Sequence, residues 1–337
     1  MIRSLHRPLF IGPMSKNVIN AIVESTLSDD VGMIPSRRQI DMPNGYVNGW
    51  STREFLSYTS RQGIIRCRDH AGPLQGAFAD DGLDSISQDC TLPHSFQIIH
   101  IDPWKKAKSI ENAAELTSSL IKHCDSLNSN VAFEVGTEQG IRPYTDNEMR
   151  EFLSLLENHL GRLFHKIVYC VVQGGTLLQG TENLETLNED RLNSMVRICN
   201  NFGLLSKEHN GDYLTSDQVT KRFQIGLDSI NIAPEFGQLE TSLILDRISE
   251  DDIEKFFEIC FNSMKWVKWL PNDFVVRSQD DKLKVIRVSG HYNFSTNEMT
   301  NIKMSSGIQD SFLVDMHKDH IQKILKSIKC LRNEKNS

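Results

Sequence analysis

Residues 63–73 read Gly63-Ile64-Ile65-Arg66-Cys67-Arg68-Asp69-His70-Ala71-Gly72-Pro73. The apolar run at the start predicts a buried strand, and the Gly-Pro pair predicts the turn that ends it. A carboxylate and an imidazole therefore stand at the carboxyl end of a strand, the edge at which parallel α/β proteins place their chemistry. An Asp beside a His is also a common structural hydrogen bond, so this pair alone does not predict a site.

Two later strands end in the same way. Residues 95–101 lead into Asp102-Pro103, and residues 203–208 lead into His209-Asn210-Gly211-Asp212. The carboxyl ends of parallel strands meet at one edge of a sheet, so these acids and histidines are expected to lie together. Three such ends predict a functional site.

Composition limits the classes of partner. The chain has 337 residues, of which 39% are hydrophobic and 24% charged, and its formal net charge is -7. Binding to nucleic acid or to an anionic membrane needs an excess of Lys and Arg on one face, so neither is expected. A small anionic substrate needs only a few local basic groups and stays possible.

The cysteines and the apolar runs indicate the compartment. The seven cysteines are odd in number and widely spaced, and they contain no Cys-x-x-Cys pair. We expect reduced thiols in a cytoplasmic protein. The N-terminal residues lack the apolar run of a signal peptide, and no run of eighteen apolar residues occurs, so no membrane segment is expected.

Short apolar runs alternate with amphipathic segments from about residue 8 to about residue 249, which predicts strands followed by helices. The expected strands are 9–11, 31–34, 64–67, 96–101, 131–135, 167–172, 204–207 and 230–233. The expected helices are 16–24, 52–62, 110–124, 147–160, 190–200, 216–224 and 239–248. Eight strands, most of them followed by a helix, predict an α/β fold, a (β/α)8 TIM barrel over residues 1–250.

A long loop and a rival fold bear on the barrel prediction. The interval 72–94 is rich in Gly and Asp and is predicted to be a long active-site loop. An open doubly wound sheet is the main rival, but it usually carries a Gly-rich phosphate turn after its first strand. Gly12-Pro13-Met14-Ser15 is not such a turn.

Residues 251–337 are predicted to form a mainly helical C-terminal extension. The segment 251–270 is expected to be one helix, whose large apolar residues are Phe256, Phe257, Cys260, Met264, Trp266 and Trp269. We expect these side chains to pack on the barrel or on a partner, which predicts a homo-oligomer. A last amphipathic helix is expected over 310–331, with a basic end that suits the helix dipole.

Short motifs in a fixed order resemble a known family. They are Ser36-Arg-Arg-Gln39-Ile-Asp41, Asp69-His70-x-Gly-Pro, Ile99-His-Ile-Asp102, Gly136-Thr137-Glu138, Val171-Val-Gln173, Glu208-His209-x-x-Asp212 and Ala233-Pro234. Their succession from about residue 30 to residue 240 resembles the Z-type subunits of tagatose-bisphosphate aldolase. The chain is similar, more distantly, to the class II ketose-bisphosphate aldolases, which bind a catalytic zinc through histidines at strand ends.

The resemblance implies roles for individual residues. It implies that His70 and His209 bind Zn2+ or another divalent metal, that Asp69 donates a proton, and that Glu134 approaches the metal. Glu138 matches the acid of the Z-type Gly-Thr-Glu motif and is expected to be catalytic. The chain departs from the aldolases where Gln173-Gly174 replaces the third zinc histidine.

Metal-assisted C–C chemistry is compatible with these residues. Zinc keeps three protein ligands and one open position, so His70, His209 and either Glu134 or Glu138 form an adequate set. Arg66, Arg68 and His70 are expected on one side of their strand by pleat alternation, near a bound anion. The expected substrate-binding residues are Arg37, Arg66, Arg68, Asp102, Gln173, Gly174, Asn210, Asp212 and Asn231.

Two functions stay open at this stage. In the first, the chain is a metal-dependent class II-type aldolase that makes or breaks a C–C bond in a phosphorylated or acidic sugar. In the second, it is a non-catalytic subunit that stabilises a separate catalytic aldolase chain. The first is preferred, because a purely structural subunit has no chemical need for acids and histidines at strand ends.

Overall fold

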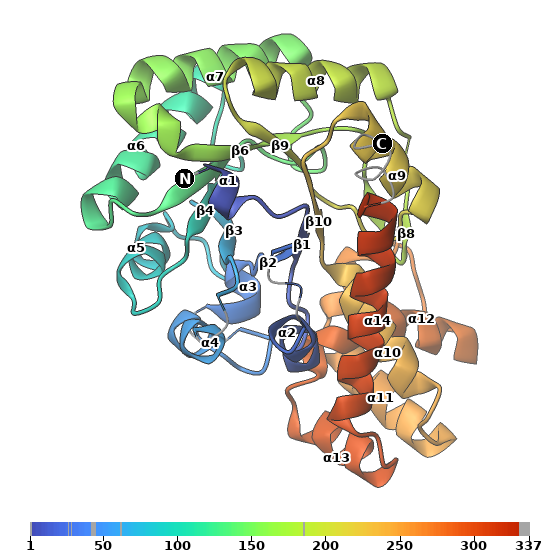
Figure 1. Ribbon diagram of the computed structural model, residues 1–337. Helices are drawn as coiled ribbons and strands as arrows, with labels where there is room; N and C mark the ends of the chain where they lie inside the picture. The colour runs from blue at the N-terminus through green and yellow to red at the C-terminus, as the bar shows by residue number, and fades with distance from the viewer. Residues whose placement is uncertain are drawn as a thin grey trace.

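The computed structural model describes residues 2–25, 27, 29–41, 45–60, 63–184 and 186–329. Its strands are β1 (Leu9–Ile11), β2 (Val31–Met33), β3 (Cys67–Ala71), β4 (Ile98–Ile101), β5 (Ala132–Val135), β6 (Ile167–Val172), β7 (Leu178–Gln179), β8 (Glu182–Asn183), β9 (Leu205–Glu208) and β10 (Ser229–Ile232). Eight of them form one parallel sheet in the order β2, β1, β10, β9, β6, β5, β4, β3. Single bridges from Met33 to Arg66 and from Ser36 to Asp69 join the two edges. The predicted TIM barrel is confirmed (Figure 1).

The helices follow the strands and cover the barrel. They are α1 (Ile2–Leu5), α2 (Lys16–Val23), α3 (Arg37–Ile40), α4 (Thr52–Thr59), α5 (Leu83–Thr91), α6 (Ile110–Leu127), α7 (Asp146–Leu160), α8 (Glu189–Asn201), α9 (Ser216–Ile225), α10 (Pro234–Leu245), α11 (Glu250–Asn262), α12 (Gln279–Ser289), α13 (Asn297–Ser305) and α14 (Asp310–Lys329). Short 3-10 helices are η1 (Gly161–Lys166), η2 (Lys265–Lys268) and η3 (Gly290–Asn293).

Local sequence explains these elements. The strands are short apolar runs, and every residue of β1, β2, β4, β5, β6 and β10 is buried, as parallel strands covered on both faces require. Ser51 and Thr215 cap α4 and α9 by accepting from the backbone N–H three residues later. Such caps satisfy donors that have no partner within the helix.

Some predicted boundaries are wrong. The third barrel strand is β3, later than the expected 64–67, and the expected loop 72–94 contains α5. The expected helix 251–270 ends at Asn262 and is followed by η2. The six cysteines in the described ranges are free, whereas Cys330 and the predicted helix ends at Gln62 and Leu331 lie outside them.

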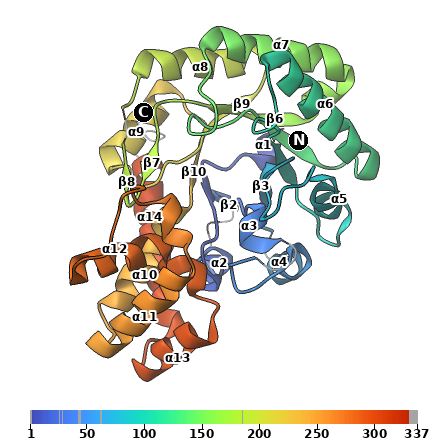
Figure 2. The same cartoon turned by 180° about the vertical axis from the view of Figure 1, so that it is seen from behind.

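The last helix completes the barrel's outer layer. After β10 the chain enters α10, and α14 returns to pack against α2 and α9, where the eighth helix of the ring is expected (Figure 2). Its apolar side chains, such as Ile321 and Leu325, belong to the barrel's core. Buried Glu240 of α10 joins the layers, because it accepts hydrogen bonds from Asn17 Nδ2 of α2 (2.8 Å) and lies 3.0 Å from His317 Nε2 of α14.

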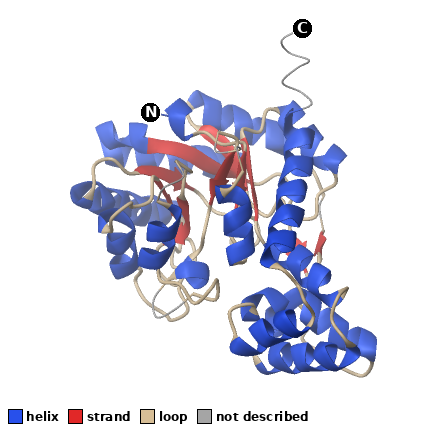
Figure 3. Cartoon of the chain, turned by 60° about the horizontal axis from the view of Figure 1, so that its bottom comes forward, coloured by secondary structure: helices blue, strands red, loops and turns tan. Residues whose placement is uncertain are grey.

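The remaining C-terminal helices form a second apolar core. Phe256, Cys260, Val285, Ile286 and Met299 are buried there, while Met264 is exposed. Figure 3 shows this helical group beside the barrel. The group approaches α10 closely at Gly237, where an added Cβ would lie 2.8 Å from the His291 side chain. The division of the chain at residue 250 stays a prediction.

No helix in the described part of the chain is long and apolar enough to cross a membrane.

Ile321 tests whether α14 is part of the barrel. Its side chain is fully buried in the barrel core, so Ile321→Ala should lower the free energy of unfolding by about 2–5 kcal/mol. The neighbouring exposed residue provides the control: Gln322→Ala should change the free energy of unfolding by less than about 0.5 kcal/mol. Urea denaturation followed by tryptophan fluorescence measures both. Equal stability of the two variants would contradict the assignment.

His291 predicts a pH dependence of stability. Its buried ring has no hydrogen-bond partner among the described residues, and burial together with the Lys268 charge lowers its pKa to about 3. Below pH about 6.5 the unfolded chain takes up a proton that the folded chain refuses. Stability should therefore be complete above this pH and fall as pH drops towards 3. Relative to His291→Leu, the wild type should lose about 1.4 kcal/mol per pH unit between pH 6 and 4, measured by urea denaturation.

Candidate active site

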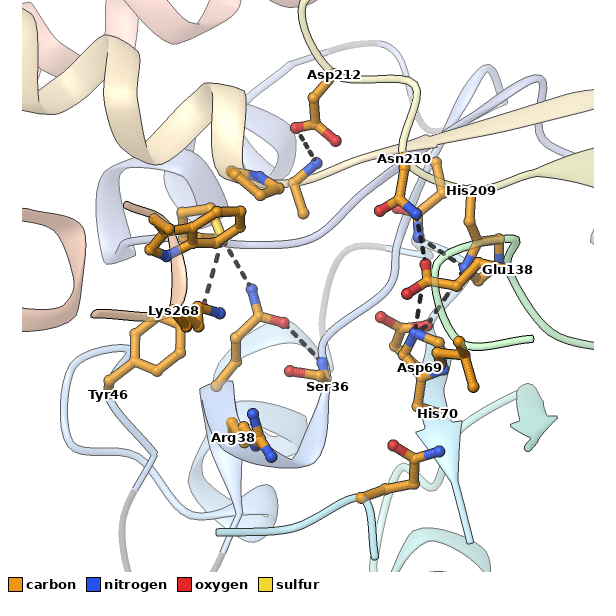
Figure 4. Close-up of a pocket in the computed structure, with 18 of the residues that line it drawn as sticks. Ser36, Arg38, Tyr46, Asp69, His70, Glu138, His209, Asn210, Asp212 and Lys268 are labelled. Atoms are coloured by element: carbon orange, nitrogen blue, oxygen red, sulfur yellow. Dashed lines mark hydrogen bonds and ion pairs between the residues drawn. The ribbon is translucent and has the colours of Figure 1, made fainter. Parts of the chain in front are cut away.

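A cavity of about 260 Å3 opens at the carboxyl ends of the barrel strands. Figure 4 shows two groups of side chains across it. Asp69, His70, Glu138, His209 and Asn210 lie on one side, and Arg38, Tyr46 and Lys268 lie on the other. The strand ends that the sequence singled out thus meet in one cavity.

Four side chains offer ligand atoms to a common point. They are Asp69, His70, His100 and His209, and their ligand atoms all lie within 4.8 Å of one another. Asp69 Oδ1 is 3.6 Å from His70 Nε2, 3.4 Å from His100 Nδ1 and 3.9 Å from His209 Nδ1. Neighbouring ligand atoms in a tetrahedral zinc site with bonds of about 2.0–2.1 Å are about 3.3 Å apart. The cluster is close to that spacing.

The outer nitrogen of each histidine is held by an oxygen. His70 Nδ1 is 2.6 Å from Asp102 Oδ2, and His209 Nε2 is 2.6 Å from Glu134 Oε1. His100 Nε2 is 3.1 Å from the carbonyl oxygen of Gly136. Metal-bound histidines show this arrangement, because the outer contact sets the tautomer and leaves the inner nitrogen as the electron-pair donor. The inner Nδ1 of His100 accepts from the His70 backbone N–H at 3.3 Å, a contact that a metal would replace. The residues therefore fit a divalent cation.

The charges around the cluster also favour a cation. Burial disfavours a charged imidazole, yet Asp69, Asp102 and Glu138 together raise the pKa of His70 to about 10. Burial opposes ionisation of Asp69 too, but the histidines outweigh it and hold its pKa well below the usual range. The carboxylates thus favour positive charge at this point, which a bound metal would supply.

An irregularity in β3 creates the cluster. The pairing of β3 with β4 shifts between Arg68 and Ala71, and His70 has a φ of 46°, in the left-handed region. Asp69 and His70 consequently face the same point although they are adjacent in sequence. The expectation that His70 shares a side with Arg66 and Arg68 is wrong, because the pleat is interrupted between them.

Glu134 lies beneath the cluster, inside the barrel. It is fully buried, and its Oε2 is 2.6 Å from Lys207 Nζ. Burial opposes its ionisation, but Lys207 and the nearby histidines keep the pKa of Glu134 well below its usual range. It is not among the four clustered ligand residues and instead orients His209.

Glu138, Asn210 and Asn231 line the cavity beside the cluster. Asn210 Nδ2 donates to Glu138 Oε2 at 2.7 Å, and this oxygen is 4.0 Å from His70 Nε2. Asn231 Oδ1 is buried and has no hydrogen-bond partner among the described residues. These groups are placed to contact a bound substrate.

Asp212 also lines the cavity, but it is held by the protein itself. Its Oδ1 accepts from the backbone N–H groups of Ala233 (2.9 Å) and Glu235 (2.8 Å) at the start of α10. Burial and the Glu235 charge raise the pKa of Asp212 to about 8.

The three predicted arginines lie outside the cavity lining. Arg37 pairs with Asp41 and Asp80, and fully buried Arg68 forms two hydrogen bonds to Asp89. Arg66 donates to the Thr59 hydroxyl at 3.2 Å and to Gln97 at 3.4 Å. These contacts place the guanidinium groups between strands and outer helices.

Asp102, Gln173 and Gly174 support the site from behind its lining. Asp102 holds His70 and also accepts from the Trp104 backbone N–H. Gln173 Nε2 donates to the carbonyls of Thr137 (3.0 Å) and Arg142 (2.9 Å). The Gln173 amide thus shapes the loop that carries Glu138.

Sequence reasoning missed three residues of the site, His100, Lys105 and Lys268, and it gave Arg38 only as one of four arginines near a bound anion, with a surface role equally open. His100 was quoted only as part of a motif, although its place in a strand beside β3 signals a ligand. Arg38, Lys105 and Lys268 line the far side of the cavity. Lys105 follows a strand end closely, whereas nothing near Lys268 in the sequence indicates its position.

Comparisons with known proteins identify the fold. No family model matches the chain, and no curated protein matches it. A probable tagatose 6 phosphate kinase from Sinorhizobium meliloti 1021 has a TM-score of 0.65 at 16% identity, covering 98% of this chain and 93% of that one. The glycerol-complexed fructuronate-tagaturonate epimerase UxaE from Cohnella laeviribosi has a TM-score of 0.65 at 10% identity, covering 96% and 81%.

A fructose-bisphosphate aldolase from Campylobacter jejuni has a TM-score of 0.50 at 14% identity, covering 92% of each chain. At such identities the likeness establishes a shared barrel fold. Membership in the Z-type aldolase subunits stays a prediction.

Metal titration tests the cluster. The purified chain should bind about one zinc ion, and the double variant His70→Ala/His209→Ala should lose it, because two of the inner nitrogens are removed. His100→Ala should weaken binding as well. The exposed His165 is the control, and His165→Ala should bind zinc like the wild type. The metal content of each variant is measured by mass spectrometry after dialysis. A full complement of zinc in the double variant would contradict the assignment of the ligands.

Proposed function

We propose that the chain is a metal-dependent aldolase that makes or breaks a C–C bond in a phosphorylated or otherwise acidic sugar. One observation carries the proposal. Three histidines with anchored outer nitrogens surround Asp69, an acid lies beside them, and basic side chains line the opposite wall of the same cavity. The barrel fold shared with sugar enzymes supports it.

The proposed metal is zinc or another divalent cation, held by His70, His100 and His209 with Asp69 beside them. When bound, it would stabilise negative charge that develops on a ketone oxygen. Glu134 and Asp102 keep two of the histidines in position through their outer nitrogens. The protein's own part is thus to present the inner nitrogens in one fixed arrangement.

Glu138 is the group that we assign to proton transfer. It faces the cavity, is partly exposed, and does not belong to the four-residue cluster. Asn210 fixes one carboxylate oxygen and leaves the other available. Asp69, predicted as the proton donor, has an oxygen among the histidine nitrogens, so we assign it a ligand role in place of the predicted one.

Activity measurements on matched variants test these roles. Glu138→Gln retains the size and an oxygen acceptor for Asn210 but cannot carry the proton, so turnover should fall by about 10²–10⁴-fold with zinc content unchanged. Asp69→Asn should lower both turnover and zinc affinity. The exposed Glu157→Gln is the control and should match the wild type. The substrates are a panel of ketose phosphates and keto sugar acids, with released triose phosphate or aldehyde detected by a coupled dehydrogenase.

The same assay addresses the non-catalytic alternative. If the wild type is inactive on the whole panel yet copurifies with another aldolase chain and raises its stability, the chain is a subunit and the proposal is wrong. Full activity of Glu138→Gln would remove Glu138 from the mechanism. Loss of activity in Asp69→Asn with full zinc would return proton transfer to Asp69.

A further inference from the structure

In barrels of this type an anionic group is often bound by the loops after the seventh and eighth strands, at the start of a following helix. Here these strands are β9 and β10, and the helix is α10. The backbone N–H groups of Ala233 and Glu235 are already used, because both donate to Asp212 Oδ1. A substrate anion at this place would meet a buried carboxylate rather than free N–H donors.

A second carboxylate strengthens this exclusion. Glu235 Oε2 accepts from the Tyr213 backbone N–H at 2.6 Å, and its Oε1 is 2.7 Å from His320 Nε2. Both acids at the start of α10 are therefore fixed in place by the fold. A phosphate at this place would therefore find the backbone N–H groups of Tyr213, Ala233 and Glu235 already occupied.

Positive charge gathers on another wall of the cavity. Arg38 of α3, Lys105 after β4 and Lys268 of η2 all line it, and we call these three the cation wall. Among the described residues, none of the three forms an ion pair with a carboxylate. Desolvation and the neighbouring charges of Arg38 and Lys265 lower the pKa of Lys268 to about 8, as expected when like charges are crowded together. An anion placed between them would relieve this repulsion.

The C-terminal helices supply part of this wall. Lys268 Nζ lies 4.2 Å from the centre of the Trp269 ring and 5.2 Å from that of Tyr292. The Trp269 Nε1 donates to the Tyr292 hydroxyl at 3.1 Å, so both rings are mutually oriented. Figure 4 shows Lys268 and Tyr46 across the cavity from the histidines. The three side chains of the cation wall are exposed, and the two rings hold Lys268 in position among them.

We infer that the substrate carries a single terminal anionic group, a carboxylate or a phosphate monoester, which binds at the cation wall, and that Asp212 excludes a second anionic group at the start of α10. This inference rests on the proposed function, because it assumes that the sugar's reacting carbons lie at the histidine cluster. It makes Arg38, Lys105, Lys268 and Asp212 the residues that determine substrate class. Ketose bisphosphates are then poor ligands.

Binding of unreactive sugar alcohols and acids tests the inference. The probes are D-glucitol 6-phosphate, D-glucitol 1,6-bisphosphate and D-gluconate, titrated calorimetrically into the zinc-loaded and the metal-free chain. The wild type should bind the monophosphate or gluconate at least about tenfold more tightly than the bisphosphate, the size expected when a second anionic group leaves water and finds no free donor. Whichever single-anion probe binds more tightly identifies the group as phosphate or carboxylate.

Three variants locate the group. Lys268→Met and Arg38→Met should each weaken the single-anion probe by about tenfold or more, because a charge-assisted contact is lost. Lys122→Met, a change at an exposed lysine of α6 outside the cavity lining, is the control and should leave affinity unchanged. Asp212→Gly frees the N–H groups of Ala233 and Glu235, so it should improve bisphosphate binding and leave the single-anion probe unaffected.

Several results would overturn the inference. These are bisphosphate binding to the wild type as tightly as the monophosphate, wild-type affinity in Lys268→Met, or no detectable binding of any probe. Failure of the proposed function is seen separately. If the wild type takes up no zinc, or cleaves no sugar, while the probes and variants behave as expected, the anion site stands and the aldolase proposal falls.

Discussion

The site depends on the ion pair between Glu134 and Lys207 inside the barrel. Both side chains are fully buried, and removal of one partner from such a pair usually costs about 3–5 kcal/mol, because the other charge stays uncompensated. Lys207 also lies over the Phe10 ring, with its Nζ 3.7 Å from the ring centre, so the pair is fixed by packing on several strands. The second oxygen of Glu134 contacts His209, so the packed interior of the barrel holds this cavity residue in place.

The other histidines of the cluster are also held in place by groups that contact their outer nitrogens. Each histidine is fixed by a group from another strand or the loop that follows it: Asp102 for His70, Gly136 for His100 and Glu134 for His209. Gln173 holds the loop after β5 through two carbonyl groups, which keeps Gly136 and Glu138 in register. The side chains that face the cavity are thus positioned by others that never reach it.

Much of the fold follows from local sequence, because buried parallel strands are short apolar runs and the helix starts carry their own caps. The site was only partly predictable. Asp69, His70, His209 and Glu138 stand at strand ends, so their convergence follows from topology. Arg68 was misplaced because its partner Asp89 lies in a helix that was taken for a loop. A ligand role for His100 was not predicted, because the resemblance implies a third zinc ligand only at the position of Gln173. Lys268 reaches the cavity only through the packing of η2 and η3 against the barrel, which no local pattern encodes.

The return of α14 to the barrel has a consequence for the synthesis of the protein. The outer layer between α2 and α9 is closed by residues 310–329, so translation must reach this helix before the first and seventh helices of the ring are covered. Until then the nascent chain exposes the apolar faces of both. Contacts that span almost the whole chain form slowly, and incomplete chains with exposed apolar surface are prone to aggregate. The position of this one helix in the sequence thus delays closure of the outer layer until nearly the whole chain has been synthesised.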